Sequence, residues 1–438
     1  MTDLFGGSGN HNAASDESSS PISADKGGRC SHEMEIPTRH KTRRSGLPPQ
    51  RRFEVNFHFA GCQRGLAVTN RAATGCPKVA KGPLVKGHPY RTAMAGRRLT
   101  VLSVAYPQFQ VTANSAGGAE QILYLLERGI TNAGHRSITI AASGSSVIGE
   151  LVETPRMGTE INASDRREAS RVHRERIQEV LQRTAVDLIH FHGLDFDTYF
   201  PEFGGPMLVT VHLPAAWYAN SALGLPGVQF CCVSYSQAQT FPYPDSVAVI
   251  PNGVDTEAYS PRTEKSDTLL WLGRICPEKG VHIALRVAHK LDLPLIVAGP
   301  LHPFRDHQHY FVNEVKPRLD EKRRWVGSVG LNEKALLLAS AKCLLIPSLA
   351  PETSSLVAME AASSSTPVIA FRSGALPEIV EHERTGFVVD GEEEMAAAVA
   401  HTREISGRYC RQRALEHFSA ERMVNEYLDL YRGLTSSV

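Results

Sequence analysis

Two glutamates in the stretch PETSSLVAMEAASSSTPVIAF have the chemistry to hold the hydroxyls of a sugar. Glu352 stands in a polar turn, and Glu360 follows eight positions later inside an apolar, helix-like run. A carboxylate accepts two hydroxyl hydrogen bonds in a fixed geometry. The helix is predicted from about Ser354 to Ser364, and Ser354 and Ser355 can cap it. Taken alone, the stretch favours a plainer interpretation, in which one glutamate belongs to a turn and the other is partly buried in a helix.

A basic pair in the segment LGRICPEKG could bind a diphosphate. Arg274 offers a planar fork of donors and Lys279 a compact charge, and together they suit two linked phosphates. A basic pair in a loop is usually solvated surface. This pair directly follows an apolar run that reads as a buried strand, which favours the functional interpretation because ligands of parallel sheets bind at strand carboxyl ends.

Glycines and histidines supply further candidates. Gly117 and Gly118 precede a predicted helix and allow a ligand to approach its N–H groups, although a plain tight turn fits equally well. No G-x-G-x-x-G pattern occurs there, which counts against a dinucleotide dehydrogenase. His190 and His192 in IHFHG share one side of a strand, but no third metal ligand stands at suitable spacing. His212 in TVHLP is the better candidate for a role in a cleft.

Alternating strands and helices must position these residues. Apolar runs that read as buried strands alternate with helical patterns in two successive series, so the fold class is α/β with two Rossmann-like domains whose parallel sheets face each other across a cleft. The first series comprises LTVLSVAYP, SITIAAS, DLIHFHG, MLVTVHL and QFCCVS, and the second TLLWLGR, LPLIVAGP, RRWVGSVG, KCLLIPS, PVIAFRS and GFVVD. The polar segment over residues 253–267 marks the boundary. The predicted domains are residues 98–255 and 256–418.

Residues 1–97 form a different kind of segment. They are low in complexity, include a basic run broken by proline and lack apolar periodicity, so disorder is predicted. Met94 directly precedes the folded part, and we hypothesise that it is the physiological initiator. A dispensable or misassigned start is the favoured interpretation of the tail.

The bulk composition limits the partners and the compartment. A net charge of +1 over 438 residues gives no reason to expect nucleic acid as a partner. No apolar run approaches the length of a membrane span, and no signal core is evident. The eight cysteines lack metal-ligand spacing and fit reduced thiols in a cytoplasmic protein. Arginines of the predicted helix over residues 164–183 could give a weak peripheral contact with an anionic membrane, although their mixture with acids favours a solvated face.

The order of motifs from Leu99 to Tyr431 resembles family 4 (group 1) of the retaining glycosyltransferases, which have the GT-B fold. The resemblance covers about three quarters of the chain and rests on GGAE, IHFHG, TVHLP, VSYSQ, VIPNGVD, LGRICPEKG, VAGP, WVGSVG, LLIPS, PETSSLVAMEA, TPVIAFRSGALPEIV and TGFVVD in this order. The E-x7-E signature of that family falls on Glu352 and Glu360. Residues 419–438 are similar to the family's last helix, which crosses back onto the first domain.

The resemblance implies a role for each candidate. Arg274 and Lys279 match the pair that holds the donor diphosphate, Glu352 the contact to the transferred sugar, and Glu360 the contact to the nucleotide ribose. Backbone amides near Leu356 and Val357 match the helix start that meets the phosphates, Gly117 and Gly118 the glycine loop of the acceptor domain, and His212 the histidine near the reacting carbon. Ser354 and Ser355 stand where the family usually has Phe-Gly. Ser355 could therefore reshape the donor pocket or weaken turnover, or the serine hydroxyls could equally replace the lost contact with a hydrogen bond. Ser364 and Ser365 replace a frequent Cys-Gly pair.

The favoured function is transfer of a sugar from a nucleotide-diphosphate donor to a saccharide or lipid-linked acceptor, with the anomeric configuration retained. The donor is a substrate, and neither a cofactor nor a metal is expected, since no paired aspartates end a strand. Two alternatives stay open. One is a nucleotide-sugar epimerase or a phosphorylase of the same fold, for which acid–base groups or a cofactor lysine motif are not evident. The other is a degenerate transferase that binds nucleotide sugars without turnover.

Overall fold

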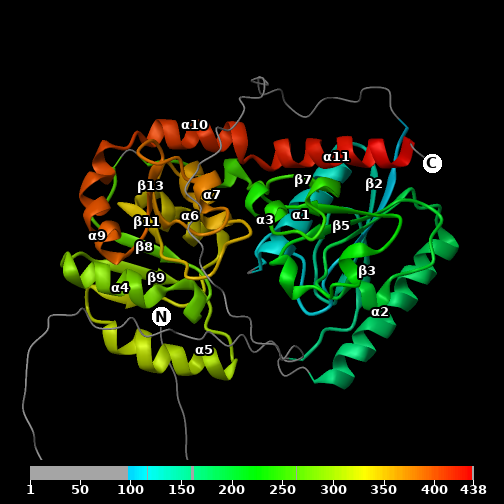
Figure 1. Cartoon of the computed structure of the whole chain (residues 1–438), viewed down its shortest axis with the longest axis horizontal. Coiled ribbons are helices and arrows are strands. Elements are labelled where there is room, and N and C mark those ends of the chain that lie inside the picture. Colours follow the sequence, from blue (N-terminus) through cyan, green and yellow to red (C-terminus); the bar gives the residue numbers. More distant parts are fainter. Residues whose placement is uncertain (1–96, 116, 159–161, 263, 437–438) are drawn as a thin grey trace, which may run out of the picture. The chain divides into compact units, whose positions relative to one another are not determined.

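A computed structural model describes residues 97–115, 117–158, 162–262 and 264–436 (Figure 1). Residues 1–96, which include Met94 and nearly all of the predicted tail, lie outside the described residues.

The first domain is a seven-stranded parallel sheet in the order β3-β2-β1-β4-β5-β6-β7. Its strands are β1 Thr100–Val104, β2 Arg136–Ala142, β3 Glu150–Thr154, β4 Leu188–Phe191, β5 Met207–Val211, β6 Val228–Cys232 and β7 Val247–Val249. Its helices are α1 Gly118–Asn132, α2 Ala163–Arg183 and α3 Tyr235–Gln239.

The second domain is a six-stranded parallel sheet in the order β10-β9-β8-β11-β12-β13. Its strands are β8 Leu269–Leu272, β9 Leu295–Ala298, β10 Arg323–Trp325, β11 Cys343–Ile346, β12 Val368–Phe371 and β13 Gly386–Val389. Its helices are α4 Val281–Lys290, α5 Arg305–Tyr310, α6 Leu331–Ser340, α7 Leu356–Ser363, α8 Leu376–Ile379, α9 Glu392–His401 and α10 Gly407–His417. Helix α11, Ala420–Ser436, follows.

The predicted fold class is confirmed, since both sheets are parallel and alternate with helices. Each apolar run that was predicted as a strand contains one, because strands buried on both faces are apolar along their whole length. Strands β3 and β7 were not predicted. They form the two edges of the first sheet, and most of their side chains are partly exposed. An edge strand with exposed side chains carries no such apolar signal.

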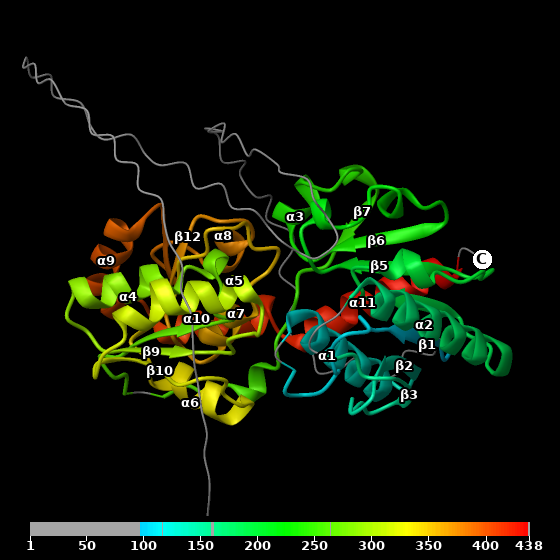
Figure 2. The ribbon, with the colours of Figure 1, turned by 90° about the horizontal axis from the view of Figure 1, so that it is seen from below.

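Helix α11 packs on the first domain. Its Met423, Val424 and Tyr427 are buried in one cluster with Val101 of β1 and Ile122 of α1. Figures 1 and 2 both show this C-terminal helix beside α1. The two chain segments meet closely because α1 carries a glycine at the contact with Val424. The end of the chain is therefore anchored on the sheet where the described fold begins.

Candidate functional site

The centre of the site is an ion pair between the carboxyl ends of two neighbouring strands. Lys279 lies in a 3-10 turn, Pro277–Lys279, after β8, and Glu352 lies in the loop after β11. The Lys279 Nζ donates to both carboxylate oxygens of Glu352, at 2.6 and 2.8 Å. The Ser348 hydroxyl also donates to Glu352, at 2.5 Å. The Glu352 side chain is 10% exposed and that of Lys279 29%, so the pair is partly shielded but reachable from solvent.

Two glycines hold the loop of Glu352 in place. Gly280 has φ +66° and Gly374 has φ +56°, conformations that favour glycine. A Cβ at Gly280 would overlap the carbonyl of Pro347, and one at Gly374 would overlap the backbone of Glu352. The chain on either side therefore approaches this loop at backbone contact distance, which fixes the position of the carboxylate.

Helix α7 begins directly after this loop. The predicted serine cap is wrong, because Ser355 stands at the N-cap position but its side chain accepts no capping hydrogen bond from the described residues. The hydroxyl of Ser354 is buried and has no hydrogen-bond partner among the described residues. The first turn, with Leu356 and Val357, thus receives no side-chain acceptor from its cap residue, and the amino end of α7 keeps the positive end of the helix dipole for an anion.

Glu360 lies inside α7 and is almost fully buried, at 2% exposure. Its Oε1 accepts from Lys334 Nζ at 2.6 Å, and burial together with the charge of the carboxylate raises the pKa of the nearby Tyr259 hydroxyl. Its Oε2 has no partner among the described residues. A buried, unpaired carboxylate oxygen is costly unless a donor reaches it, so a ligand hydroxyl would have a clear partner here. Lys334 was not predicted as a partner, because it lies 26 positions away on another helix.

A small cavity brings Glu360 together with residues of α1. It measures about 70 Å³ and its walls include Tyr124, Arg128, Tyr259, Leu356 and Glu360. The walls thus come from both domains. The buried carboxylate is therefore part of a hollow surface rather than of a solid core.

The glycine pair at the start of α1 also lies at this site. Gly118 faces Leu356 of α7, since a Cβ placed on this glycine would lie 3.6 Å from a leucine methyl. A Cβ at Gly117 would overlap the carboxylate of Glu120, which folds back over the glycine. Burial raises the pKa of Glu120, and the charge of Arg274 opposes that rise. Glu120 was missed as a candidate, although it belongs to the GGAE motif.

The three histidines form a buried network at the ends of β4 and β5. His192 Nδ1 lies 3.0 Å from His212 Nε2, and His190 bonds to Tyr431 of α11 and to Thr210. Burial lowers the pKa of His212 to about 4, so the imidazole is neutral at pH 7. The backbone carbonyl of His212 accepts from the hydroxyl of Thr353, at 2.8 Å, which links it to the loop of Glu352.

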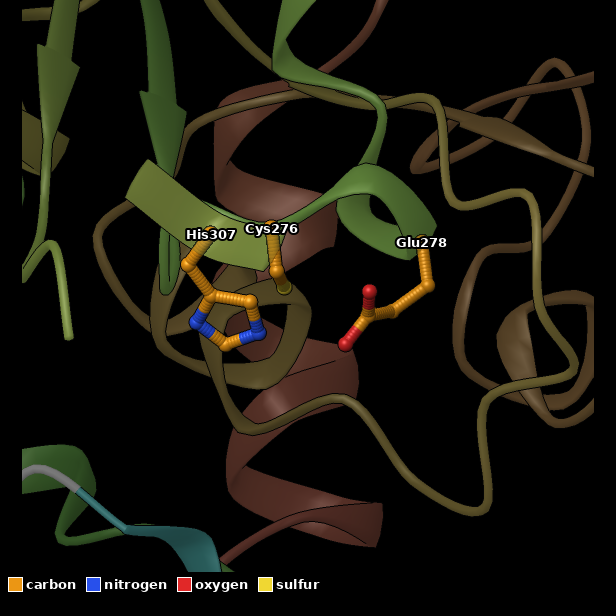
Figure 3. Close-up of side chains that lie close together, drawn as sticks. All are labelled: Cys276, Glu278 and His307. Atoms are coloured by element: carbon orange, nitrogen blue, oxygen red, sulfur yellow. The ribbon is translucent and has the colours of Figure 1, made fainter. Parts of the chain in front are cut away.

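One cluster of metal-ligating types lies beside the basic pair. Cys276, Glu278 and His307 place one ligand atom each within 4.8 Å of one another (Figure 3). Burial and the nearby Glu278 raise the pKa of the Cys276 thiol to about 12. The thiol donates to the backbone carbonyl of Arg274, at 3.4 Å, so the protonated form is stabilised. This grouping was not predicted from the sequence, because His307 stands on a different helix.

Several of the predicted site residues contact one another or are joined through one intermediate residue. Lys279 and Glu352 touch, Gly118 meets Leu356, and Thr353 joins His212 to the loop of Glu352. Arg274 acts electrostatically on Glu120. The assignment of these residues to a donor site stays a prediction.

Two families match the chain. The one described as Glycosyltransferase Family 4 matches residues 116–258, and the one described as Glycosyl transferases group 1 matches residues 266–404. The first segment covers the first sheet except β1, and the second covers all strands of the second sheet.

Known proteins are similar to parts of the chain or to its fold. The chain is 31% identical over 170 residues to the D-inositol 3-phosphate glycosyltransferase of Corynebacterium glutamicum (strain R). This match covers 34% of this chain and 40% of that protein. The chain thus matches less than half the length of that relative. AviGT4, a glycosyltransferase involved in avilamycin A biosynthesis, has a TM-score of 0.59 and 23% identity over 77% of this chain and 99% of its own. Anabaena Alr3699/HepE in complex with UDP-glucose has a TM-score of 0.61 and 15% identity, and the match covers 77% of this chain and 100% of that chain. At these identities the structures show the fold.

Proposed function

Because the chain belongs to the glycosyltransferases of group 1 and family 4, we propose that it transfers a sugar from a nucleotide-diphosphate donor to an acceptor hydroxyl, with retention of the anomeric configuration. The observation that carries the proposal is the Lys279–Glu352 pair at the strand ends, beside the amino end of α7. This arrangement combines a cation, open helix amides and a hydroxyl acceptor within one loop system.

The positive groups would act on the leaving diphosphate. As the bond between the sugar and the diphosphate breaks, negative charge grows on the phosphate oxygen. Lys279 is held by Glu352 before the reaction, and Lys279, Arg274 and the amino end of α7 would stabilise that charge. In a front-face mechanism the departing phosphate accepts the proton of the acceptor hydroxyl, so no enzymic nucleophile is required.

The other groups would orient the donor. Glu352 would accept hydrogen bonds from the transferred sugar, and the unpartnered Oε2 of Glu360 would accept from the ribose. His212 is neutral, since burial lowers its pKa to about 4, so it would hold a sugar hydroxyl by hydrogen bonding rather than by charge. Anabaena HepE has been captured with UDP-glucose, which makes UDP-sugars the first donors to examine.

The acceptor would be a saccharide or a lipid-linked saccharide. Among the described residues, no helix has the length and apolar character that crossing a membrane demands. A weak peripheral membrane contact stays a prediction. Arg171 of α2 pairs with Glu168 and Glu175, which neutralises part of the charge that such a contact would use.

A turnover assay with defined donors tests the proposal. The protein is incubated with UDP-glucose, GDP-mannose or ADP-glucose and a panel of saccharide acceptors, and release of the nucleoside diphosphate is followed. Nuclear magnetic resonance of the product then reports the anomeric configuration. We expect one donor to be consumed with retention. An inverted product would contradict the mechanism, and saturable donor binding without any turnover would instead support a binding protein.

A further inference from the structure

A second, larger cavity lies at the opposite edge of the second sheet. It measures about 850 Å³, and its walls include Asp267, Lys342 and Pro367, which lie within two residues before β8, β11 and β12. Lys279 and Glu352 follow the carboxyl ends of β8 and β11. Because all these strands are parallel, the cavity and the donor site lie at opposite ends of the same strands.

The cavity is strongly basic. Its walls carry six lysines and arginines but only two carboxylates among the described residues, those of Asp267 and Glu416. Lys342 and Arg403 share Asp267, at 3.0 and 3.1 Å. Within the described part of the chain, no ion pair is formed by the remaining cations: Arg262, Lys265, Arg408 and Arg411. The positive charge of the cavity therefore exceeds what the carboxylates of the described residues neutralise.

Two of these cations hold the carboxyl end of α7. Lys265 Nζ donates to the Ser364 carbonyl at 3.1 Å and to the Thr366 hydroxyl at 2.6 Å, and Arg411 donates to the Ser363 carbonyl at 2.6 Å. These acceptors are neutral, so they satisfy the donors without cancelling the charges. Burial lowers the pKa of Lys265 to about 8.

The cavity wall also contains a strained residue. Ser365 has φ +59°, a left-handed conformation that is unfavourable for a non-glycine residue. Such strain persists where surrounding structure maintains it and is often found at binding sites.

We propose that this cavity is a second binding site, for a small molecule that carries a phosphate group on a polyhydroxyl body. Its volume lies within the range of about 300–1,000 Å³ that is typical of small-molecule sites and far exceeds that of a bare anion. The unpaired cations Arg262 and Arg408 would bind the phosphate. Asp267, Gln412 and Glu416 would accept hydrogen bonds from the hydroxyls of the ligand. The carboxylates of Asp267 and Glu416 would repel an extended polyanion.

Occupation of the cavity would be coupled to the donor site through α7. The helix starts beside Glu352 and ends at the cations of the cavity, so a ligand that draws Lys265 or Arg411 away from its carbonyls alters the anchoring of α7. Coupling of this kind is reciprocal. The coupling between the two sites rests on the proposed function, whereas binding in the cavity does not.

Isothermal titration calorimetry tests the binding. The titrants are glucose 6-phosphate, inorganic phosphate and glucose, applied to the whole chain, to an Arg262→Ala/Arg408→Ala variant and to a matched Arg156→Ala/Arg324→Ala variant. All four arginines are exposed, so the replacements leave the core intact, and circular dichroism checks the fold. We expect the sugar phosphate to bind at least tenfold more weakly to the first variant and unchanged to the second. Arg274→Ala should also leave this binding unchanged, which separates it from binding at the donor site.

Several outcomes would overturn the proposal. Absence of saturable binding by the sugar phosphate would remove the site, as would equal binding by the Arg262→Ala/Arg408→Ala variant. Equally tight binding of inorganic phosphate would reject the polyhydroxyl part, and equal binding of glucose would reject the phosphate part. None of these measurements needs turnover, so the result is independent of the transferase assay.

Discussion

At the scale of single residues, the site depends on charges that are paired before any ligand arrives. Lys279 holds Glu352 from both oxygens, and Lys334 holds Glu360 from one. A buried or half-buried carboxylate is stable only when donors surround it. The lysines therefore position the acids, and under the proposed function Lys279 would also meet the leaving phosphate.

Replacement of Lys279 tests this double role. In Lys279→Ala the developing phosphate charge loses a fixed cation and Glu352 loses its counter-ion, so kcat/KM should fall about 100- to 1,000-fold, equivalent to about 3 kcal/mol. Initial rates over a range of donor concentrations measure the loss. Lys290→Ala, which removes an equal charge from the surface of α4, should leave the rate unchanged. A rate for Lys279→Ala within twofold of the unmodified protein would rule out the assignment.

The buried His173 should make stability depend on pH. Burial lowers its pKa to about 4, whereas an unfolded histidine titrates near its ordinary value of 6.5. Between these values only the unfolded chain gains the proton, so this contribution to stability is present above pH 6.5 and is lost as pH falls towards 4. Urea unfolding at pH 7, 6, 5 and 4 should show that His173→Gln removes up to about 3 kcal/mol of this dependence. Parallel plots of the free energy of unfolding against pH for the unmodified protein and His173→Gln would contradict this prediction.

At the scale of elements, the long C-terminal helix and α1 form one layer on the first sheet. Tyr427 and Tyr431 of α11 are fully buried, and Tyr431 donates or accepts a 2.8 Å hydrogen bond with His190 at the end of β4. The helix thus adds both apolar packing and polar contacts to the histidine network. Its docking also determines the surroundings of His212, which bonds to the neighbouring His192.

A glycine sets the distance between these two helices. A Cβ at Gly129 would lie 2.6 Å from a Val424 methyl, so Gly129→Ala should force the helices apart and destabilise the protein by about 1–3 kcal/mol. Gly433→Ala is the matched control, because a Cβ there meets no atom of the described residues within 4 Å and alanine favours a helix. Chemical unfolding should therefore shift in opposite directions for the two variants. Equal shifts would show that the contact is not tight.

At the scale of the whole described chain, few polar contacts join the two domains. Glu378 of α8 accepts hydrogen bonds from the backbone N–H groups of Tyr235 and Ser236 at the start of α3, at 3.0 and 2.6 Å. Arg128 of α1 pairs with Asp255 at 2.9 Å, in the segment between the two sheets. Interfaces with few polar contacts generally permit relative movement of domains.

Removal of Glu378 should loosen this connection. In Glu378→Ala the two N–H groups lose a charged acceptor, so stability should fall by about 1–3 kcal/mol. Hydrogen exchange followed by mass spectrometry should show faster exchange in the peptide that contains Tyr235 and Ser236. Glu404→Ala, on an exposed turn, is the control and should leave that peptide unchanged. Unchanged exchange in Glu378→Ala would mean that the contact contributes nothing to holding α3.

Local sequence patterns were sufficient to predict the two parallel sheets and the loops that carry the candidate residues. Strands buried on both faces must be apolar throughout, and the helices between them must be amphipathic, so each signal lies within a short segment. The edge strands β3 and β7 escaped prediction, because their partly exposed side chains are not constrained in this way.

Which charges meet became clear only from the packing of the folded chain. Lys279 and Glu352 are separated by 73 positions, and Lys334 and Glu360 by 26. The burial of Glu120 and the basic cavity at the far end of α7 likewise depend on neighbours that are distant in sequence. A local pattern determines the path of the backbone, but a side-chain contact is determined only when separate segments pack together.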